Sequence, residues 1–197
     1  MVLRILKPRL IDPGPFVIEA LRTVRTDPAA FAEIVYFEAM RDDRLLRDFA
    51  TGPLYLLYSS GRSHVTVEDT LDWLATLSEP RARAWSDTVR VKVGRGLLAA
   101  LRDFGVLEGA VKKRFGSPRI SNSGFAYAAW RLTGEAGADR VIFTTDLWRA
   151  WLLDARRVEE LALELDRQGV WSYAAAGSST RIDWRSRDVY EVLDAAT

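Results

Sequence analysis

Seven cations gather in one short part of the chain, and such a group can bind the phosphates of a nucleic acid. They are Lys92, Arg95, Arg102, Lys112, Lys113, Arg114 and Arg119. Residues 86–120 hold 8 Lys/Arg against 3 Asp/Glu, a net charge of +5, whereas the whole chain of 197 residues carries +1. Each cation that meets a phosphate releases counterions, so clustered cations favour binding more than scattered ones. We expect these seven to form one binding surface, and an ordinary solvated charged face is the alternative.

The first three cations fall on a predicted helix. Ser86 or Asp87 is a suitable N-cap for a helix that runs to about Phe104. Its apolar residues share one arc at helical spacing: Val93, Leu97, Leu98, Leu101 and Phe104. Lys92, Arg95 and Arg102 lie on the opposite side. The pattern therefore predicts that one side of the helix faces a core and that the other presents cations.

The other four cations fall on a predicted β-hairpin. Residues 106–115 should form its first strand and turn region, and residues 119–120 its returning strand, with 116–118 at the tip. A short helix capped by Thr66 and ended by Pro80 precedes the long helix. Two helices followed by a hairpin have the order of a winged helix-turn-helix, in which a helix enters the major groove. Cations on the wing then contact phosphates, which adds affinity but little sequence information.

A similar helix-plus-hairpin is predicted over residues 158–184. Residues 105–106 match 169–170 in type, and 119–120 match 181–182. An internal duplication and a chance match of two short amphipathic units both explain this likeness. The second helix carries acids instead of cations, which would repel phosphate: Glu159, Glu160, Glu164 and Asp166.

The fold class predicted from these patterns is mainly α: a helical bundle with winged helix-turn-helix-like units and two short β-hairpins. We divide the chain into an N-terminal helical region (1–65), the basic winged-helix-like unit (66–121) and a second helix-plus-hairpin unit (122–197). The other helices are expected at 16–25, from Pro28 to about Met40, at 45–49 with an end near Gly52-Pro53, at 124–132, 145–153 and 188–195. Residues 54–60 are almost all apolar and are expected to be buried.

The seven tryptophans are better explained as core residues than as platforms for stacked bases. Trp148 and Trp151 recur at helical spacing, and Trp73, Trp85 and Trp130 follow the same logic. The last two, Trp171 and Trp184, should face each other across the second hairpin.

Catalytic chemistry has little support in the sequence. His64 is the only histidine, it lies in a predicted loop, and no metal cluster or catalytic triad can be assembled around it. The absence of cysteine excludes disulfides and cysteine-ligated metals. We expect no enzymatic activity, no cofactor and no bound metal.

No apolar run approaches the roughly 18 residues that cross a bilayer. The first fifteen residues are interrupted by charges and prolines, so they make a poor signal peptide and read as an extended leader. We therefore expect a cytoplasmic protein with no membrane partner.

Three stretches together resemble one family of proteins. They are YFEAMRDDRLLRDF (36–49), AWSDTVRVKVGRGLLAALRDFGVLEG (84–109) and TTDLWRAWLLDARRVEELALELDRQGVWSYAAAG (144–177). They are similar to the BrxA family, the small A proteins of bacteriophage-exclusion (BREX) defence systems. The resemblance implies a helical protein with winged-helix character, no known catalytic activity and a place beside the other BREX proteins. Members are regarded as nucleic-acid binders, and comparison to the RNA-binding protein NusB leaves RNA open as well as DNA.

These observations lead to one functional expectation, which is a non-enzymatic protein that binds double-stranded DNA through residues 86–121. RNA binding, and a scaffold role toward other BREX proteins, are the alternatives that the sequence leaves open.

Overall fold

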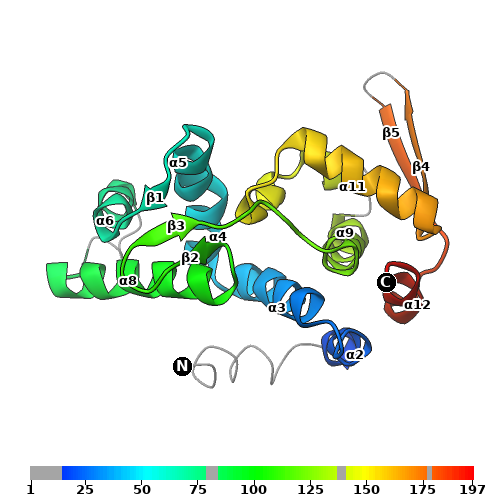
Figure 1. Cartoon of the computed structure of the whole chain (residues 1–197), viewed down its shortest axis with the longest axis horizontal. Helices are drawn as coiled ribbons and strands as arrows, with labels where there is room; N and C mark the ends of the chain where they lie inside the picture. Colours follow the sequence, from blue (N-terminus) through cyan, green and yellow to red (C-terminus); the bar gives the residue numbers. More distant parts are fainter. Residues whose placement is uncertain (1–14, 79–83, 137–140, 177–178) are drawn as a thin grey trace. The chain divides into compact units, whose positions relative to one another are not determined.

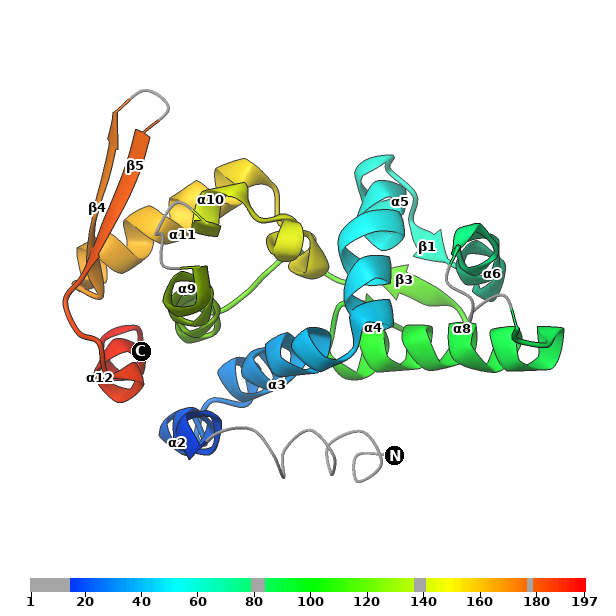
Figure 2. The same cartoon turned by 180° about the vertical axis from the view of Figure 1, so that it is seen from behind.

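The computed structural model describes residues 15–78, 84–136, 141–176 and 179–197 (Figures 1 and 2). The chain is mainly α-helical with two small antiparallel sheets, which confirms the predicted fold class. The expected leader before Pro15 lies outside the described residues.

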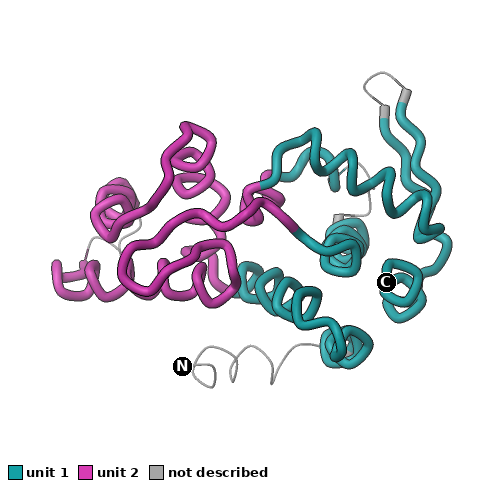
Figure 3. Tube along the Cα trace, in the orientation of Figure 1, with its two compact units in different colours: residues 1–42, 120–145, 153–197 teal, residues 43–119, 146–152 magenta. Residues whose placement is uncertain are grey.

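The chain divides into two compact units, each made of segments that are far apart in the sequence (Figure 3). Unit 1 combines residues 1–42, 120–145 and 153–197, and unit 2 combines 43–119 and 146–152. Unit 2 holds 14 Lys/Arg against 10 Asp/Glu, a net charge of +4, and unit 1 holds 14 against 17, a net charge of −3. The three regions expected from the sequence, 1–65, 66–121 and 122–197, are defined by function and ancestry. Contacts between residues do not test such a division, so it stays a prediction.

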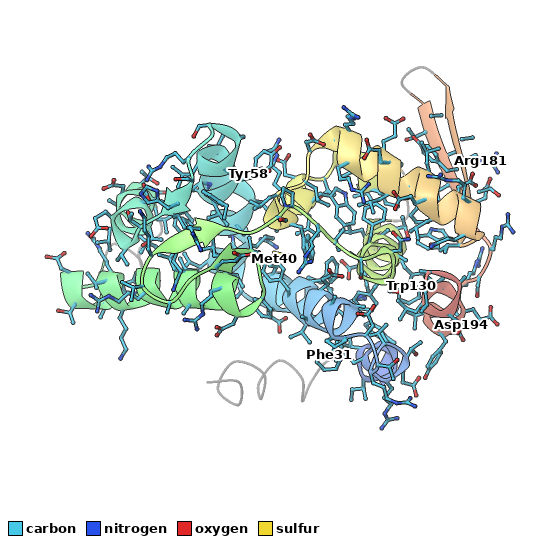
Figure 4. All side chains as sticks on the ribbon, in the orientation of Figure 1. Phe31, Met40, Tyr58, Trp130, Arg181 and Asp194 are labelled. Carbon is cyan, nitrogen blue, oxygen red and sulfur yellow. The ribbon has the colours of Figure 1, made fainter. Side chains whose placement is uncertain are left out.

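Unit 2 is built from short helices and a small sheet. Its elements are α4 (Arg44–Phe49), the π-helix η1 (Ala50–Leu54), α5 (Tyr55–Ser59), β1 (His64–Val65), α6 (Val67–Thr76), α8 (Asp87–Asp103), β2 (Leu107–Glu108), β3 (Lys113–Phe115) and the 3-10 helix η2 (Asp146–Trp151). Aromatic pairs link these elements: the rings of Phe49 and Trp73 lie 5.1 Å apart, and those of Tyr58 and Phe115 lie 5.5 Å apart. Tyr58 is labelled on α5 in Figure 4.

The helical segment that begins at Arg44 does not end near Gly52-Pro53 as predicted. It continues through η1 into α5, with Pro53 inside the π-helical turn. A π-helical turn is wider than an α-helical one, so it accommodates a proline ring that would disrupt an α-helix. The expected burial of residues 54–60 is also wrong, because Leu54 is buried but Leu56 is 66% exposed.

The sheet of unit 2 has the strand order β1-β3-β2, with every pair antiparallel. Its hairpin differs from the predicted one, because β2 returns as β3 around residues 109–112, and 116–120 are not a strand. The predicted tip at 116–118 and the predicted strand at 119–120 are therefore wrong. The first strand, β1, joins from a segment that was predicted to be a loop.

Helices α6 and α8 pack closely in unit 2. Thr66 begins α6 with the predicted capping box, in which it exchanges hydrogen bonds with Asp69. At the crossing, Gly94 of α8 lies so close to Thr70 of α6 that a Cβ atom there would overlap the Thr70 Oγ1 atom. Thr70 is fully buried. The absence of a side chain at Gly94 therefore sets the distance between the two helices.

Unit 1 surrounds a buried central helix. Its elements are α2 (Pro15–Thr23), α3 (Pro28–Asp42), α9 (Asn122–Ala136), α10 (Val141–Thr144), α11 (Ala155–Gln168), β4 (Trp171–Ala176), β5 (Ser179–Trp184) and α12 (Val189–Ala195). Helix α9 contacts α3, α10, α11 and α12, and residues 123–129 along it are all buried. Trp130, in the second half of α9, is labelled in Figure 4.

Side chains of α3 fix α9 at two points. Glu33 accepts hydrogen bonds from the Ser121 main-chain N–H at 3.0 Å and from the Ser121 hydroxyl, while Ser121 Oγ accepts one from the N–H of Gly124. Five residues further along α3, Glu38 accepts hydrogen bonds from the Tyr127 hydroxyl (2.7 Å) and from Arg131 Nε (3.2 Å). A partly buried carboxylate at each point thus ties the two helices together.

The two strands of the second hairpin pair as predicted, and residues 177–178 between them lie outside the described residues. Strands β4 and β5 pair in a register that sets Trp171 opposite Trp184, and their rings lie 4.8 Å apart at 80°. The buried Trp171 also donates from Nε1 to the Ala162 carbonyl at 2.9 Å. Trp148 and Trp151 are buried as expected, although residues 146–151 form a 3-10 helix rather than the expected α-helix. Trp73, Trp85 and Trp130 are half-buried.

Candidate nucleic-acid interface

Helix α8 presents two exposed cations on one side. Ser86 caps its first turn, accepting a hydrogen bond from the N–H of Val89 at 3.4 Å. Its buried side consists of Gly94, Leu97, Leu98 and Leu101. Lys92 and Arg95, three residues apart, are both exposed, and Val89 (39% exposed) and Gly96 lie on the same side. The predicted orientation of α8 is confirmed for Lys92 and Arg95.

Arg102 is less available than its two neighbours on α8. It is half-buried, and its guanidinium donates to Asp103 Oδ1 from Nε at 3.0 Å and from NH2 at 2.5 Å. This ion pair offsets the positive charge at the end of the helix. The structure therefore places Arg102 on α8 as predicted, but bound to a carboxylate.

The three consecutive cations of the hairpin do not share one face. In the register of the sheet, Arg114 stands between His64 and Glu108, and these side chains belong to the exposed face. Lys113 belongs to the other face, opposite the buried Val65. The expected single surface of seven cations is therefore divided, because successive residues of a strand point to opposite sides of the sheet.

Lys113 binds carbonyl oxygens of its own turn. It is only 8% exposed, and its Nζ donates to the Gly109 carbonyl at 2.7 Å and to the Ala110 carbonyl at 2.5 Å. Burial, with a smaller contribution from the charge of Arg102, lowers the pKa of Lys113. The ammonium group has main-chain partners in place of a phosphate.

The remaining cations are exposed. Lys112 lies in the turn of the hairpin, Arg114 on β3, and Arg119 on the segment without regular secondary structure that follows β3. No carboxylate of the described residues lies within 4.0 Å of the charged nitrogens of these three cations or of Lys92 and Arg95. Five of the seven predicted cations are thus exposed in unit 2 without an ion pair in the described ranges.

Two features of this region were missed from the sequence. His64 lies on β1 rather than in a loop, beside Arg114, with the Ser63 hydroxyl 3.2 Å from its Nδ1. A two-residue strand has too little pattern to detect. The inward position of Lys113, in contrast, could have been predicted from the sequence. Successive residues of a strand point to opposite faces, so either Lys113 or Arg114 must face inward.

The acids of α11 in unit 1 are largely paired within the unit. Glu160 accepts hydrogen bonds from Arg156 and Arg157, which lower its pKa, and Glu164 accepts one from Arg157. Asp166 accepts a hydrogen bond from the N–H of Tyr173 on β4. These acids stabilise α11 and its hairpin, and they contrast with the unpaired Lys92 and Arg95 of α8.

Within the described ranges, no three His, Cys, Asp or Glu side chains come together as metal ligands. None of the helices found there has both the length and the apolar character to span a bilayer.

Comparison with known proteins identifies a family. The sequence profile of the BrxA family matches residues 16–130, a segment that runs from α2 into α9 and includes all seven predicted cations. No curated protein and no solved structure matches the chain. Since the matched segment covers more than half of the 197 residues, the chain belongs to the BrxA family.

Proposed function

We propose that this protein is a non-enzymatic component of a BREX phage-defence system and that it binds double-stranded DNA through unit 2. The BrxA family is a family of BREX-type phage-defence proteins, so the chain is a component of a phage-defence system. The observation that carries the finer proposal is the set of exposed, unpaired cations in one compact unit: Lys92, Arg95, Lys112, Arg114 and Arg119. Such cations gain affinity for a polyanion through counterion release.

The order of the elements in unit 2 supports DNA as the polyanion. The elements follow one another as α5-β1-α6-α8-β2-β3, with β1 paired to β3, and this order is compatible with a winged helix in which α8 would be the recognition helix and β2–β3 the wing. The exposed side of α8 offers Val89, Lys92 and Arg95. A lysine or arginine can donate to guanine O6 and N7 in the major groove, and a valine can contact a thymine methyl group.

The first test compares two variants with the same loss of charge. The Lys92→Ala/Arg95→Ala variant removes cations from α8, and the control Arg156→Ala/Arg181→Ala removes two exposed arginines from unit 1. Fluorescence anisotropy with duplex DNA, single-stranded DNA and RNA measures the affinity of each protein at low salt. We expect the first variant to weaken duplex binding at least tenfold more than the control. Equal losses would indicate a general charge effect, and tighter binding of RNA would replace the DNA proposal.

A scaffold function is the second candidate, and unit 1 gives it a specific observation. The β4–β5 hairpin has six residues in each strand, and no further strand pairs with its outer edges among the described residues. Free strand edges can accept a strand from a partner protein. Co-purification with another BREX protein, together with no shift of duplex DNA or RNA at low salt, would favour this candidate. Cleavage of DNA in the presence of magnesium would contradict the non-enzymatic proposal.

A further inference from the structure

The turn of the β2–β3 hairpin carries an unusual exposed side chain. Val111 is 98% exposed, more than the other large hydrophobic residues exposed in the described part of the chain, of which Leu56 is next at 66%. Lys112 follows it and is exposed as well. An isolated exposed valine needs no explanation by itself, but this one stands at the tip of a turn whose backbone is held from inside.

Three features hold the backbone of this turn. Gly109 has φ +89°, and a Cβ atom there would overlap the Lys112 carbonyl oxygen. Strands β2 and β3 fix the two ends through their pairing. Lys113, turned to the inner face of the sheet, reaches back with its ammonium group to the carbonyls of Gly109 and Ala110.

The two hydrogen bonds from the Lys113 ammonium group, called here the Lys113 bridge, hold the turn and do not set the register of the strands. Burying an ammonium group costs free energy unless it is hydrogen-bonded, and here it bonds two main-chain carbonyls of the turn. Those carbonyls would otherwise be free to bind water while the turn moved. Ordering a loop before binding lowers the entropy lost on binding, so this arrangement favours a turn that contacts a partner.

We propose that the turn of residues 109–112 inserts Val111 into the minor groove of A·T-rich duplex DNA, and that Lys113 is a positioning residue that holds the turn. The inference rests on the proposed function. Lys112 and Arg114 follow the tip on the β3 arm of the hairpin with exposed positive charge, which complements the phosphates along one rim of a groove. The guanine 2-amino group projects into the minor groove as a donor, and a valine side chain has no acceptor for it, so A·T pairs are favoured.

Three duplexes of equal length test the groove and the base preference, one of A·T pairs, one of G·C pairs and one of inosine·C pairs. An inosine·C pair presents the major groove of G·C but lacks the 2-amino group in the minor groove. We expect the full-length protein to bind the inosine·C duplex roughly fivefold more tightly than the G·C duplex, because these two duplexes share their major-groove groups and differ only in the minor-groove 2-amino group. The A·T duplex also lacks guanine O6 and N7, so it should bind more weakly than the inosine·C duplex if α8 contacts these atoms. Equal binding of G·C and inosine·C would overturn the insertion. If the protein binds none of the three, the proposed function itself fails.

Variants separate the roles of the individual side chains. Val111→Ala should weaken A·T binding roughly tenfold, since it removes apolar surface from the contact, whereas the control Leu163→Ala, at an exposed leucine of α11 (44% exposed), should not. Lys113→Met keeps the aliphatic stem but loses the bridge. It should weaken binding without changing the dependence of log K on log salt, whereas Lys112→Met should reduce that slope by about 0.9. A reduced slope in Lys113→Met would identify Lys113 as a phosphate ligand and overturn the positioning role.

Discussion

Two glycines of α8 should respond in opposite ways to the same substitution. Gly94 faces α6, where a Cβ atom would overlap Thr70 Oγ1 and lie 3.2 Å from Thr70 Cβ. Gly96 is exposed, and a Cβ atom there would meet nothing within 4 Å. The pair therefore tests the α6–α8 contact with a control only two residues away on the same helix.

The expected magnitudes follow from these surroundings. Replacing an exposed glycine in a helix by alanine stabilises by about 0.5–1 kcal/mol, so Gly96→Ala should raise the melting temperature. Gly94→Ala gains the same helix propensity but must separate two packed helices, and such overpacking costs about 1–3 kcal/mol. We expect a net loss of about 1–2 kcal/mol for Gly94→Ala. In a chain of this length each kcal/mol corresponds to about 2–4 °C in melting temperature.

Calorimetry of both variants, of Thr70→Ala and of the double variant Thr70→Ala/Gly94→Ala measures these effects. Thr70→Ala removes the overlapping oxygen, so Gly94→Ala should cost at least about 0.5 kcal/mol less in that background. If Gly94→Ala and Gly96→Ala raise the melting temperature equally, then Gly94 does not lie against Thr70 and the packing of unit 2 is misassigned.

Two further predictions concern carboxylates. Glu33→Gln should destabilise the protein by about 1–2 kcal/mol, because Ser121 loses its charged acceptor near the start of α9, and urea unfolding at pH 7 measures the change; unchanged stability would contradict the capping role. Burial alone would raise the pKa of Asp69, but hydrogen bonds from Thr66 and the charge of Arg62 lower it below its usual 3.8. The contribution of the Asp69 carboxylate to the free energy of unfolding is therefore present above about pH 4, and it is lost as the pH falls through the pKa of Asp69 in the folded protein. Asp69→Asn should lower the free energy of unfolding at pH 7 and lower it much less at pH 2. An equal loss at both pH values would contradict the lowered pKa of Asp69.

Local sequence patterns predicted the elements whose signals lie within a few residues. The sequence predicts a cap at Thr66 and another at Ser86 or Asp87, of which the structure uses Ser86. The amphipathic pattern of α8 likewise places Lys92 and Arg95 on its exposed side. The tight second hairpin likewise set Trp171 opposite Trp184. In each case the determining interactions are local, so their pattern is visible in the sequence.

The errors arise where distant contacts decide the structure. Strand β1 is two residues long and exists only because it pairs with β3, some fifty residues later. The early turn at 109–112 depends on the conformation of Gly109 and on the bridge from Lys113, whereas the turn-forming residues 116–118 gave the stronger local signal. Residues 119–120 are not a strand, whereas 181–182 lie in β5, so these two pairs match in residue type but differ in secondary structure.

The salt dependence of duplex binding tests the central claim most directly. The wild-type protein is compared with a variant in which the five exposed cations of unit 2 are replaced by alanine: Lys92, Arg95, Lys112, Arg114 and Arg119. The logarithm of the binding constant is measured against the logarithm of the salt concentration for both proteins. If all five contact phosphates, the slope of the variant should be smaller by about 4–5, at about 0.9 for each contact. An unchanged slope, in a variant that melts like the wild type, would contradict unit 2 as the DNA-binding surface.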